Sequence, residues 1–297
     1  MYVLDHMNFR VTAFSPDGRV LWKVGRAGRG PGEFQLPYRL DVAPNGNIVV
    51  FDFGASEVTT LSPSGTFVGR VRLPFSFRQV DNLVALANGD LLISGFTTAN
   101  DRVTQFGIHR FRVRGEQLEH IASFGPLPNA RDREVLAHWG AGNVVRTSAG
   151  DLLYLLRLPY EVHRYDSGGR ERAVYRPRTP LRAVPDDFVR IERTARGTAV
   201  SSAQPRLERL GSVLEVANRW VVASRIGPAG TTWDLFDVSG RLVASRAIPR
   251  EWGALLGYDR ARNVLWLAGT QDDAPVLLRL VVVPVVDGRR SRGGPSR

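Results

Sequence analysis

Short apolar runs recur along the whole chain, and polar turn residues separate them. A five-residue pattern marks many of these turns: an aromatic residue or a leucine, three further residues, and a glycine that precedes the next apolar run. The copies are Phe14–Gly18, Leu61–Gly65, Phe111–Gly115, Tyr165–Gly169 and Phe236–Gly240. Their glycines lie 47, 50, 54 and 71 residues apart, and Gly288 follows 48 residues after the last of them. The pattern predicts a chain built from repeated units of short strands.

A repeat of about 40–50 residues made of strands and glycine turns is typical of a β-propeller. We therefore expect an all-β fold, a six-bladed β-propeller of four-stranded antiparallel blades, with strand a of each blade innermost and strand d outermost. A single domain is expected over residues 1–288, with blades at about 1–35, 36–78, 79–128, 141–176, 210–250 and 251–288.

The second unit shows the expected blade most clearly. Its strands a to d are predicted at Arg39–Ala43, Asn47–Phe51, Val58–Leu61 and Thr66–Leu73. Asn45-Gly46 separates the first two strands, and this dipeptide predicts a tight hairpin because both residues tolerate a positive φ.

The first and last units are expected to be incomplete in this chain. Residues 1–5 already have the sequence of a strand b, and only a basic tail, 289–297, follows Asp287-Gly288. We expect this tail to be disordered. Because native proteins avoid open sheet edges, we expect the natural protein to begin upstream of Met1 with a segment that supplies the missing strands and an export signal. A periplasmic or cell-surface location follows, whereas a true start at Met1 favours the cytoplasm.

Two stretches do not fit the blade repeat, namely 129–140 and 177–209. In the second, Asp186-Asp187 is predicted to cap a short helix through Phe188, Ile191 and Ala195. Both insertions connect a strand d to the next strand a, and a propeller places these connections on one face with the b-to-c loops. This loop-rich face is a candidate binding surface. The alternative is that the insertions only cover the channel mouth.

Composition changes this picture in three ways. The formal charge of +11 suggests a nucleic-acid partner, but Lys23 is the single lysine, and such an arginine bias is also typical of a GC-rich genome. The chain has no cysteine, which excludes disulfides, thiolate metal sites and a cysteine nucleophile. No apolar run reaches the ~18–20 residues of a membrane span.

The segment Gly25–Pro37, GRAGRGPGEFQLP, resembles the inter-blade motif of NHL-repeat propellers. The resemblance is strong over about residues 1–70 and looser beyond them. It implies a six-bladed, TolB-like ring, similar to bacterial propellers that are often exported or lipid-anchored. Relatives of this kind include protein-binding and RNA-binding modules and a minority of metal-dependent lyases and lactonases.

Within the motif, we expect Glu33 to accept backbone N–H bonds and Phe34 to pack between blades. Asp5 and Asp52 occupy equivalent repeat positions, but the counterparts in later units lack ligating charge: Gly95 or Phe96, Leu158, and Gly269 or Thr270. An axial metal site needs several such ligands. We therefore expect the two aspartates to bind loop backbone groups, and we expect no metal and no cofactor.

The five histidines show neither HxH nor HxxxH spacing. His138, beside Trp139, is the one histidine that we single out for a functional role, against the alternative of a structural side chain. No serine or threonine lies near a recognisable base and orienting acid, so no catalytic residue is predicted.

The leading hypothesis is a non-enzymatic propeller that binds a protein, peptide or glycan on its loop-rich face, in the bacterial cell envelope. Arginine and aromatic side chains are good interface anchors, and the candidate ligand-binding residues are Arg26, Arg29, Arg131, Arg133, Trp139, Tyr160 and Glu161. The alternative is an RNA-binding NHL-type propeller, which predicts arginines concentrated on one face. A third possibility is a metal-dependent lyase-like or lactonase-like enzyme.

Overall fold

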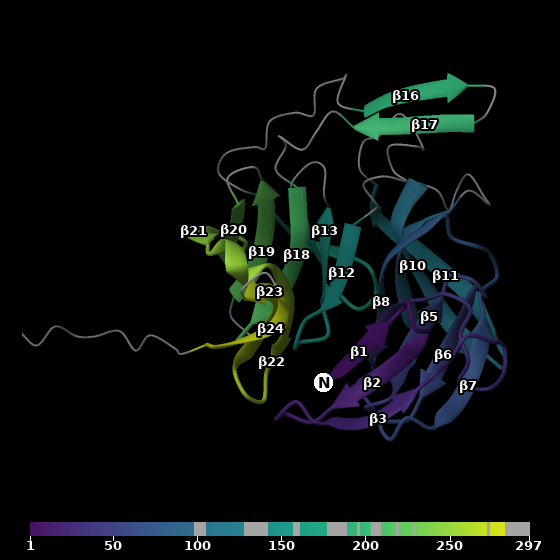
Figure 1. The fold of residues 1–297 in the computed structure, drawn as a ribbon. Helices are drawn as coiled ribbons and strands as arrows, with labels where there is room; N and C mark the ends of the chain where they lie inside the picture. Colours follow the sequence, from purple (N-terminus) through teal and green to yellow (C-terminus); the bar gives the residue numbers. More distant parts are fainter. Residues whose placement is uncertain are drawn as a thin grey trace, which may run out of the picture.

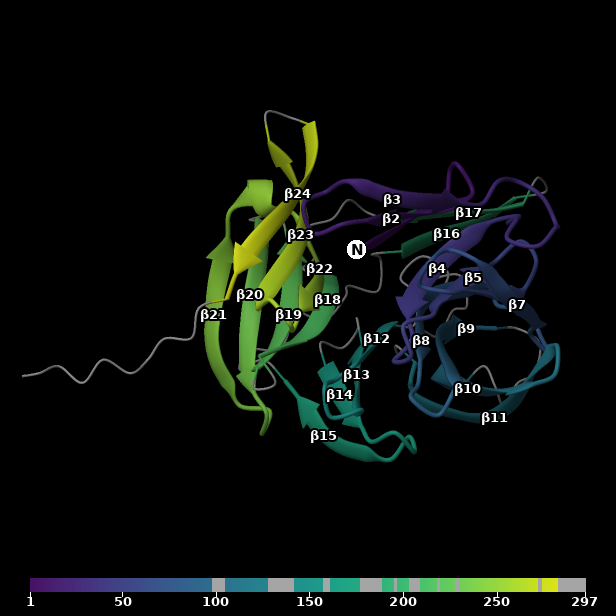
Figure 2. The ribbon, with the colours of Figure 1, turned by 90° about the horizontal axis from the view of Figure 1, so that it is seen from below.

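The computed structural model describes residues 1–97, 105–127, 142–156, 161–176, 189–194, 197–202, 209–217, 220–227, 230–271 and 274–282. Within these residues the chain forms small antiparallel sheets that follow one another around a common centre (Figures 1 and 2). The fold is a six-bladed β-propeller, as the repeat predicts.

Blades 1 and 2 follow the predicted strand pattern. Blade 1 contains β1 (Tyr2–Asp5), β2 (Arg10–Phe14) and β3 (Val20–Val24). Blade 2 contains β4 (Pro37–Val42), β5 (Ile48–Asp52), β6 (Glu57–Leu61) and β7 (Phe67–Arg72). Asp5 pairs with Arg10 at the end of β1 just as Asp52 pairs with Glu57 at the end of β5. β1 is therefore a strand b, as predicted.

Blades 3 and 4 each have four strands. Blade 3 consists of β8 (Gln79–Ala85), β9 (Leu91–Phe96), β10 (Phe106–Arg114) and β11 (Gln117–Pro126). Blade 4 consists of β12 (Gly142–Arg146), β13 (Leu152–Leu156), β14 (Glu161–Tyr165) and β15 (Glu171–Tyr175). The outer strands of blades 2 and 3 meet at one parallel pair, Arg72 with Gln117.

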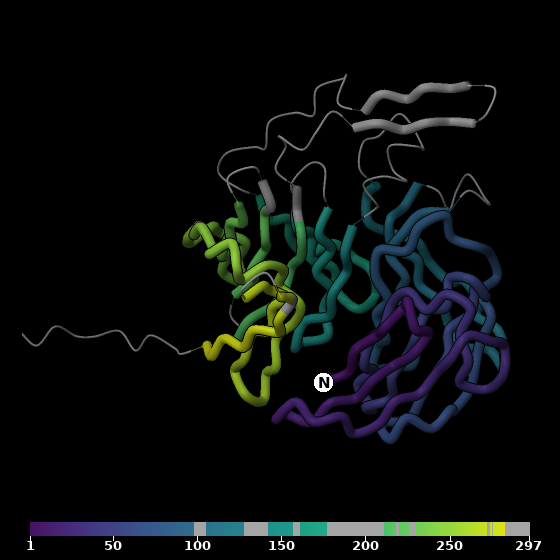
Figure 3. The backbone as a smooth tube through the Cα atoms, in the orientation of Figure 1, coloured from purple at the N-terminus to yellow at the C-terminus, as the bar shows by residue number. Residues whose placement is uncertain are grey.

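Blade 5 contains β18 (Arg209–Val216), β19 (Trp220–Gly227), β20 (Gly230–Asp237) and β21 (Leu242–Ile248). A 3₁₀ turn, η2 (Arg250–Trp252), leads into blade 6, whose described strands are β22 (Ala254–Asp259), β23 (Val264–Gln271) and β24 (Ala274–Val281). Among the described residues, the first and last blades thus have three strands each. In Figure 3 the tube visits the blades in chain order around the centre.

The predicted short helix between blades 4 and 5 is wrong. Ile191 lies in β16 (Val189–Thr194), which forms an antiparallel hairpin with β17 (Gly197–Ser202). The sequence Val-Arg-Ile-Glu alternates apolar and polar residues, and its β-branched members favour a strand. The proposed cap, Asp186-Asp187, lies outside the described residues, as do insertion 129–140 and tail 289–297.

The hairpin turns also differ from the expected type. At the first turn of blade 2 only Gly46 has a positive φ, 87°, and its N–H donates to Ala43 O at 2.8 Å. Ala43 N–H in turn donates to Asn47 O at 2.8 Å. This is a type I turn followed by a left-handed glycine, which needs one such glycine rather than two left-handed residues.

The core lies between the blades rather than in one central layer. All five residues of β5 are buried. Ile48 and Val50 pack in the cluster shared with blade 1, whereas Val49 and Phe51 pack in the cluster shared with blade 3. A strand that is buried on both faces has an uninterrupted apolar sequence, and blade 2 is therefore held between blades 1 and 3.

Polar side chains of the inner strands tie successive blades together around the centre. Arg39 Nε donates to Asp81 O at 2.6 Å, and Asn82 Nδ2 donates to Val144 O at 2.7 Å. Asn143 Nδ2 continues the series with a 3.2 Å bond to Gly211 O. These bonds join blades 2, 3, 4 and 5 in order.

Candidate functional site

Three of the described seams between blades are closed by an aromatic ring that packs against a glycine of the next blade. In each case the glycine belongs to the turn between strands c and d. A β-carbon on these glycines would lie 2.3–2.9 Å from the nearest ring atom, so the ring packs directly on the glycine backbone. The pairs are Trp22 with Gly65, Phe124 with Gly169, and Tyr175 with Gly240.

The seam between blades 2 and 3 lacks such a ring. Trp22 pairs with Ala13 immediately before a bulge, and Gly69 pairs with Thr60 at the same place in blade 2. Both positions face the following blade. Gly69 has no heavy atom within 4 Å of the place where a β-carbon would lie. A glycine thus stands where blade 1 carries its indole, whereas blades 3, 4 and 5 carry Ala122, Ala173 and Ala244 there. Phe124 and Tyr175 lie two positions further along strand d, where blade 2 has Val71.

The strand c to d hairpin of blade 3 is also longer than its counterparts. Its pairing continues from Phe111 to Arg114, beyond the position where the other hairpins turn. Gly115, at its tip, has no heavy atom within 4 Å of its β-carbon position. The sequence pattern aligned Gly115 with the seam-closing glycines, but the extra strand pairs carry it past them.

A groove with a cavity volume of about 970 Å³ lies between blades 2 and 3, beside Gly69 and the tip of the long hairpin of blade 3. Val49, Val71 and Leu91 provide apolar surface at its base. The remaining walls come from the a-to-b turns of both blades, from all of β7, and from the tip of the long hairpin: 43–45, 85–87, 89, 67–72, 113 and 115–117. Its volume exceeds the 350 Å³ or so of the cavity lined by Arg146, Glu215 and Arg260.

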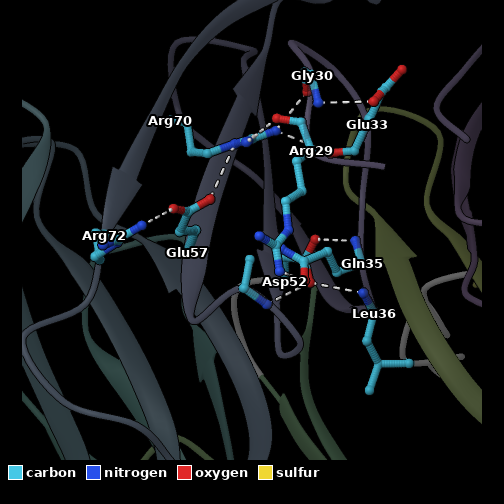
Figure 4. A network of polar contacts seen from close by, with 10 residues as sticks. Arg29, Gly30, Glu33, Gln35, Leu36, Asp52, Glu57, Arg70 and Arg72 are labelled. Atoms are coloured by element: carbon cyan, nitrogen blue, oxygen red, sulfur yellow. Dashed lines mark hydrogen bonds and ion pairs between the residues drawn. The ribbon is translucent and has the colours of Figure 1, made fainter. Parts of the chain in front are cut away.

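A polar network fixes the β7 side of the groove (Figure 4). Arg70 donates to the carbonyl oxygens of Arg29, Gly30 and Glu33 at 3.0, 2.8 and 3.0 Å. Its Nε also lies 3.3 Å from Glu57 Oε2, while Arg72 Nη2 lies 3.3 Å from Glu57 Oε1. The Arg70 side chain is held by these partners, whereas the Arg72 side chain is 71% exposed.

The glycine-rich motif has the structural role that its sequence predicts. The Gly30 N–H donates to Glu33 Oε2 at 2.8 Å, and this bond, with help from Arg26, holds the pKa of Glu33 below its usual value. Phe34 is fully buried between blades 1 and 2. Asp52 accepts the N–H groups of Gln35 and Leu36 at 2.7 and 2.8 Å (Figure 4).

Asp5 makes the corresponding local contacts in blade 1. Its carboxylate accepts the backbone N–H and side-chain amide of Asn8 at 3.1 and 2.9 Å, and Arg10 at 3.3 Å. Asp5 therefore binds groups of its own blade, and Asp52 binds backbone groups of the connection that leads into blade 2.

The predicted ligand-binding residues are not gathered into one site among the described residues. Arg26 Nε donates to Glu33 Oε1 at 2.6 Å, and Arg29 Nη2 lies 3.5 Å from Gln35 Oε1, both in the connection from blade 1 to blade 2. Glu161 belongs to blade 4, where Arg176 Nε donates to it at 2.6 Å. Arg131, Arg133, Trp139 and Tyr160 lie outside the described residues, as does His138.

Sequence reasoning missed a histidine cluster in blade 3. His109 Nδ1 and His120 Nε2 lie 2.9 and 2.7 Å from Ser123 Oγ, with Phe75 and Phe77 in contact with the rings. Burial and the neighbouring His120 lower the pKa of His109 to about 4. The two histidines are 11 residues apart in sequence, and only the pairing of β10 with β11 brings them together.

A third histidine, His163, lies between two carboxylates in blade 4. His163 Nδ1 is 2.8 Å from Glu171 Oε2, and its Nε2 is 3.0 Å from Glu161 Oε2. Burial and, next, the charge of Glu171 raise the pKa of Tyr165, whose hydroxyl donates to the same glutamate.

Charged side chains also meet near the centre of the ring. Arg260 Nη2 lies 3.4 Å from Glu215 Oε2, and Arg146 Nη1 lies 3.7 Å from Asp41 Oδ2. Burial raises the pKa of Asp41 against the opposing effects of the Ala85 N–H and Arg146. A smaller cavity of about 350 Å³ lies between Arg146, Glu215 and Arg260.

Over the described part of the chain, no group of three or more His, Asp or Glu side chains is arranged to hold a metal ion. No helix in that part is long and apolar enough to cross a membrane.

Comparisons with known proteins agree with the fold. A family described as "6-bladed beta-propeller" matches residues 1–120. No curated protein matches the sequence. Among solved structures, a Bacteroides fragilis protein that is described as exported is 14% identical to this chain. Its TM-score is 0.64, over 90% of this chain and 75% of that one.

Two further structures extend the comparison. A member of the duf4221 family from Bacteroides vulgatus is 7% identical, with a TM-score of 0.58 over 92% of this chain and 86% of that one. A catalytically inactive virginiamycin B lyase from Staphylococcus aureus is 12% identical, with a TM-score of 0.53 over 95% of this chain and 91% of that one. At these identities the likeness concerns the fold alone. The chain is thus a six-bladed β-propeller, similar over residues 1–120 to the propeller family named above.

Proposed function

We propose that this chain is a non-enzymatic binding propeller of the cell envelope that receives a segment of a partner protein in the groove between blades 2 and 3. The open seam at Gly69 is the observation that carries this proposal. Ligand sites are concave, largely apolar and about 300–1,000 Å³ in volume, and they carry a few placed polar groups. The groove has these properties.

The arrangement of its walls favours a polypeptide over a glycan. Apolar side chains form the base, and Val68 and Val113 add exposed apolar surface, 57% and 43%, at the sides. Glu57 pairs with both Arg70 and Arg72, so this group keeps one positive charge, and the exposed Arg72 lies at the end of β7. Such a surface suits apolar side chains flanked by backbone polar groups.

The test is selection of peptides from a random seven-residue display library on the immobilised protein. Enriched peptides are then measured by fluorescence anisotropy against wild type, Gly69→Trp and Val243→Trp. Gly69 has an ordinary backbone conformation and free space beside it, so the indole fills the groove. Val243 is an exposed residue of the outer strand β21 and is the matched control.

We expect at least a tenfold loss of affinity for Gly69→Trp and less than a twofold change for Val243→Trp. A selection that enriches no peptide, or peptides that bind Gly69→Trp as well as wild type, would refute the proposed function.

The envelope location is supported by the similarity in fold to a protein that is described as exported. It is tested by expressing the gene with its native upstream DNA and fractionating the cells. Recovery outside the cytoplasm is expected, and a purely cytosolic protein contradicts this part of the proposal.

A further inference from the structure

The outer strand of blade 2 lines the groove along its whole length. All six residues of β7, Phe67–Arg72, line the cavity. Alternate side chains of a strand point to opposite faces of its sheet. Residues of both sets line the cavity, so it runs along the backbone of β7 as well as beside Gly69.

Part of the edge of β7 already forms a β-type contact. Arg72 N–H donates to Glu116 O at 2.9 Å, which shows that Arg72 points its backbone groups away from β6. Backbone groups of an antiparallel pair alternate in direction every residue, so Arg70 points the same way. The pairing of β7 with β11 ends at Arg72 and Gln117, and it provides no partner for Arg70.

We propose that the partner segment binds as an added β-strand along the edge of β7, with a large apolar side chain in the hollow beside Gly69. This inference rests on the proposed function and specifies how the segment binds. In strand addition, main-chain hydrogen bonds supply affinity and side-chain hollows supply specificity.

The molecule itself indicates the size of the side chain. In the seam between blades 1 and 2, the position equivalent to Gly69 carries Trp22, which packs on Gly65 and donates its indole N–H to Pro63 O at 3.1 Å. The hollow beside Gly69 is the place where blade 2 lacks this ring. An aromatic or long aliphatic side chain from outside takes that place, while its backbone continues the hydrogen bonding that begins at Arg72.

The first test is a backbone N-methyl scan of the most enriched display peptide, labelled with fluorescein. Methylation removes one N–H at a time. We expect losses of at least tenfold at alternate peptide positions and little change at the positions between them, because a paired strand turns every second N–H toward its neighbour. Losses without this two-residue alternation overturn the strand-addition inference.

The second test is residue-resolved hydrogen exchange of the full chain with and without the same peptide. Exchange at the Arg70 N–H is expected to slow at least tenfold on binding, whereas Arg72, which is already bonded to Glu116, changes little. Unchanged exchange at Arg70 overturns the inference. If Gly69→Trp still abolishes binding in that case, the groove remains the binding site and only the mode of binding is wrong.

Replacement of the largest apolar residue of the peptide by alanine completes the design. A loss of at least tenfold is expected on wild type. An unchanged affinity overturns the assignment of a side chain to the hollow beside Gly69.

Discussion

His109 is fully buried, and its Nε2 has no hydrogen-bond partner among the described residues. Its Nδ1 faces Ser123 Oγ, and the same hydroxyl faces His120. Charging such a ring is costly because burial removes its hydration. The pKa of His109 accordingly falls to about 4, and burial also lowers the pKa of His120.

We therefore expect the free energy of unfolding to fall as pH decreases from about 6.5 to 4. In this window His109 binds a proton in the unfolded chain but stays neutral in the folded protein. A pKa shift of this size lowers the free energy of unfolding by about 3 kcal/mol. The measurement is urea denaturation at several pH values. His109→Asn, which keeps a donor near Ser123, is expected to have lower stability at neutral pH but a flatter pH dependence.

His6 is exposed, and His6→Gln is the control. Its pH dependence should match wild type. A slope that His109→Asn leaves unchanged would show that other groups, His120 first among them, cause the loss of stability in acid.

Among the structural elements, the c-to-d turns have two roles according to their place in the ring. Gly18 and Gly169 adopt the same left-handed conformation, with φ of 85° and 88°. Gly18 has open space beside it, whereas Gly169 lies against the Phe124 ring. The first glycine serves the turn alone, and the second also closes a seam.

Replacement by alanine separates these roles. Gly18→Ala and Gly169→Ala both place a β-carbon in a left-handed conformation, which costs about 1–2 kcal/mol. Gly169→Ala adds a clash with Phe124, and such overpacking costs about 1–3 kcal/mol more. Chemical denaturation of both variants measures the difference. Equal losses would show that the Phe124 ring moves aside freely and that the closed seams are not tightly packed.

Over the part of the molecule that the structure describes, arginines that pair with carboxylates are spread around the ring. Arginines in all six blades lie within ion-pair distance of a carboxylate: Arg10, Arg19, Arg26, Arg70, Arg72, Arg110, Arg112, Arg114, Arg146, Arg164, Arg172, Arg176, Arg225, Arg241, Arg260 and Arg262. An RNA-binding surface instead needs unpaired cations concentrated along a path. This distribution favours the binding of a protein segment.

We expect a fluorescein-labelled 20-nucleotide single-stranded RNA to bind no more tightly than the ~10⁻⁴–10⁻⁶ M typical of non-specific contacts at physiological salt. A variant with glutamine in place of Arg289, Arg290, Arg292 and Arg297 measures the contribution of the tail. Nanomolar binding that persists in this variant would contradict the expectation and favour the RNA hypothesis.

Much of the architecture follows from sequence because its signals are local. The strands of blade 2 begin and end within two residues of their predicted limits, since turn residues and apolar runs fix them. The roles of Glu33, Phe34 and Asp52 also follow from the motif that contains them. The helix predicted through Ile191 failed because Ile191 belongs to two patterns at once: helical spacing with Phe188 and Ala195, and strand alternation with Val189.

The candidate site depends on relations that no local pattern contains. Gly69 is unremarkable in sequence, and its meaning comes from the register that makes it the counterpart of Trp22 in another blade. The histidines of blade 3 meet through strand pairing, and the long hairpin of blade 3 pairs with β7 only at Arg72. The sequence alone determined the repeat, the strands and the turns, because neighbouring residues set them. Packing between blades decided which seam holds a groove, because each seam is formed by residues about 50 positions apart in the sequence.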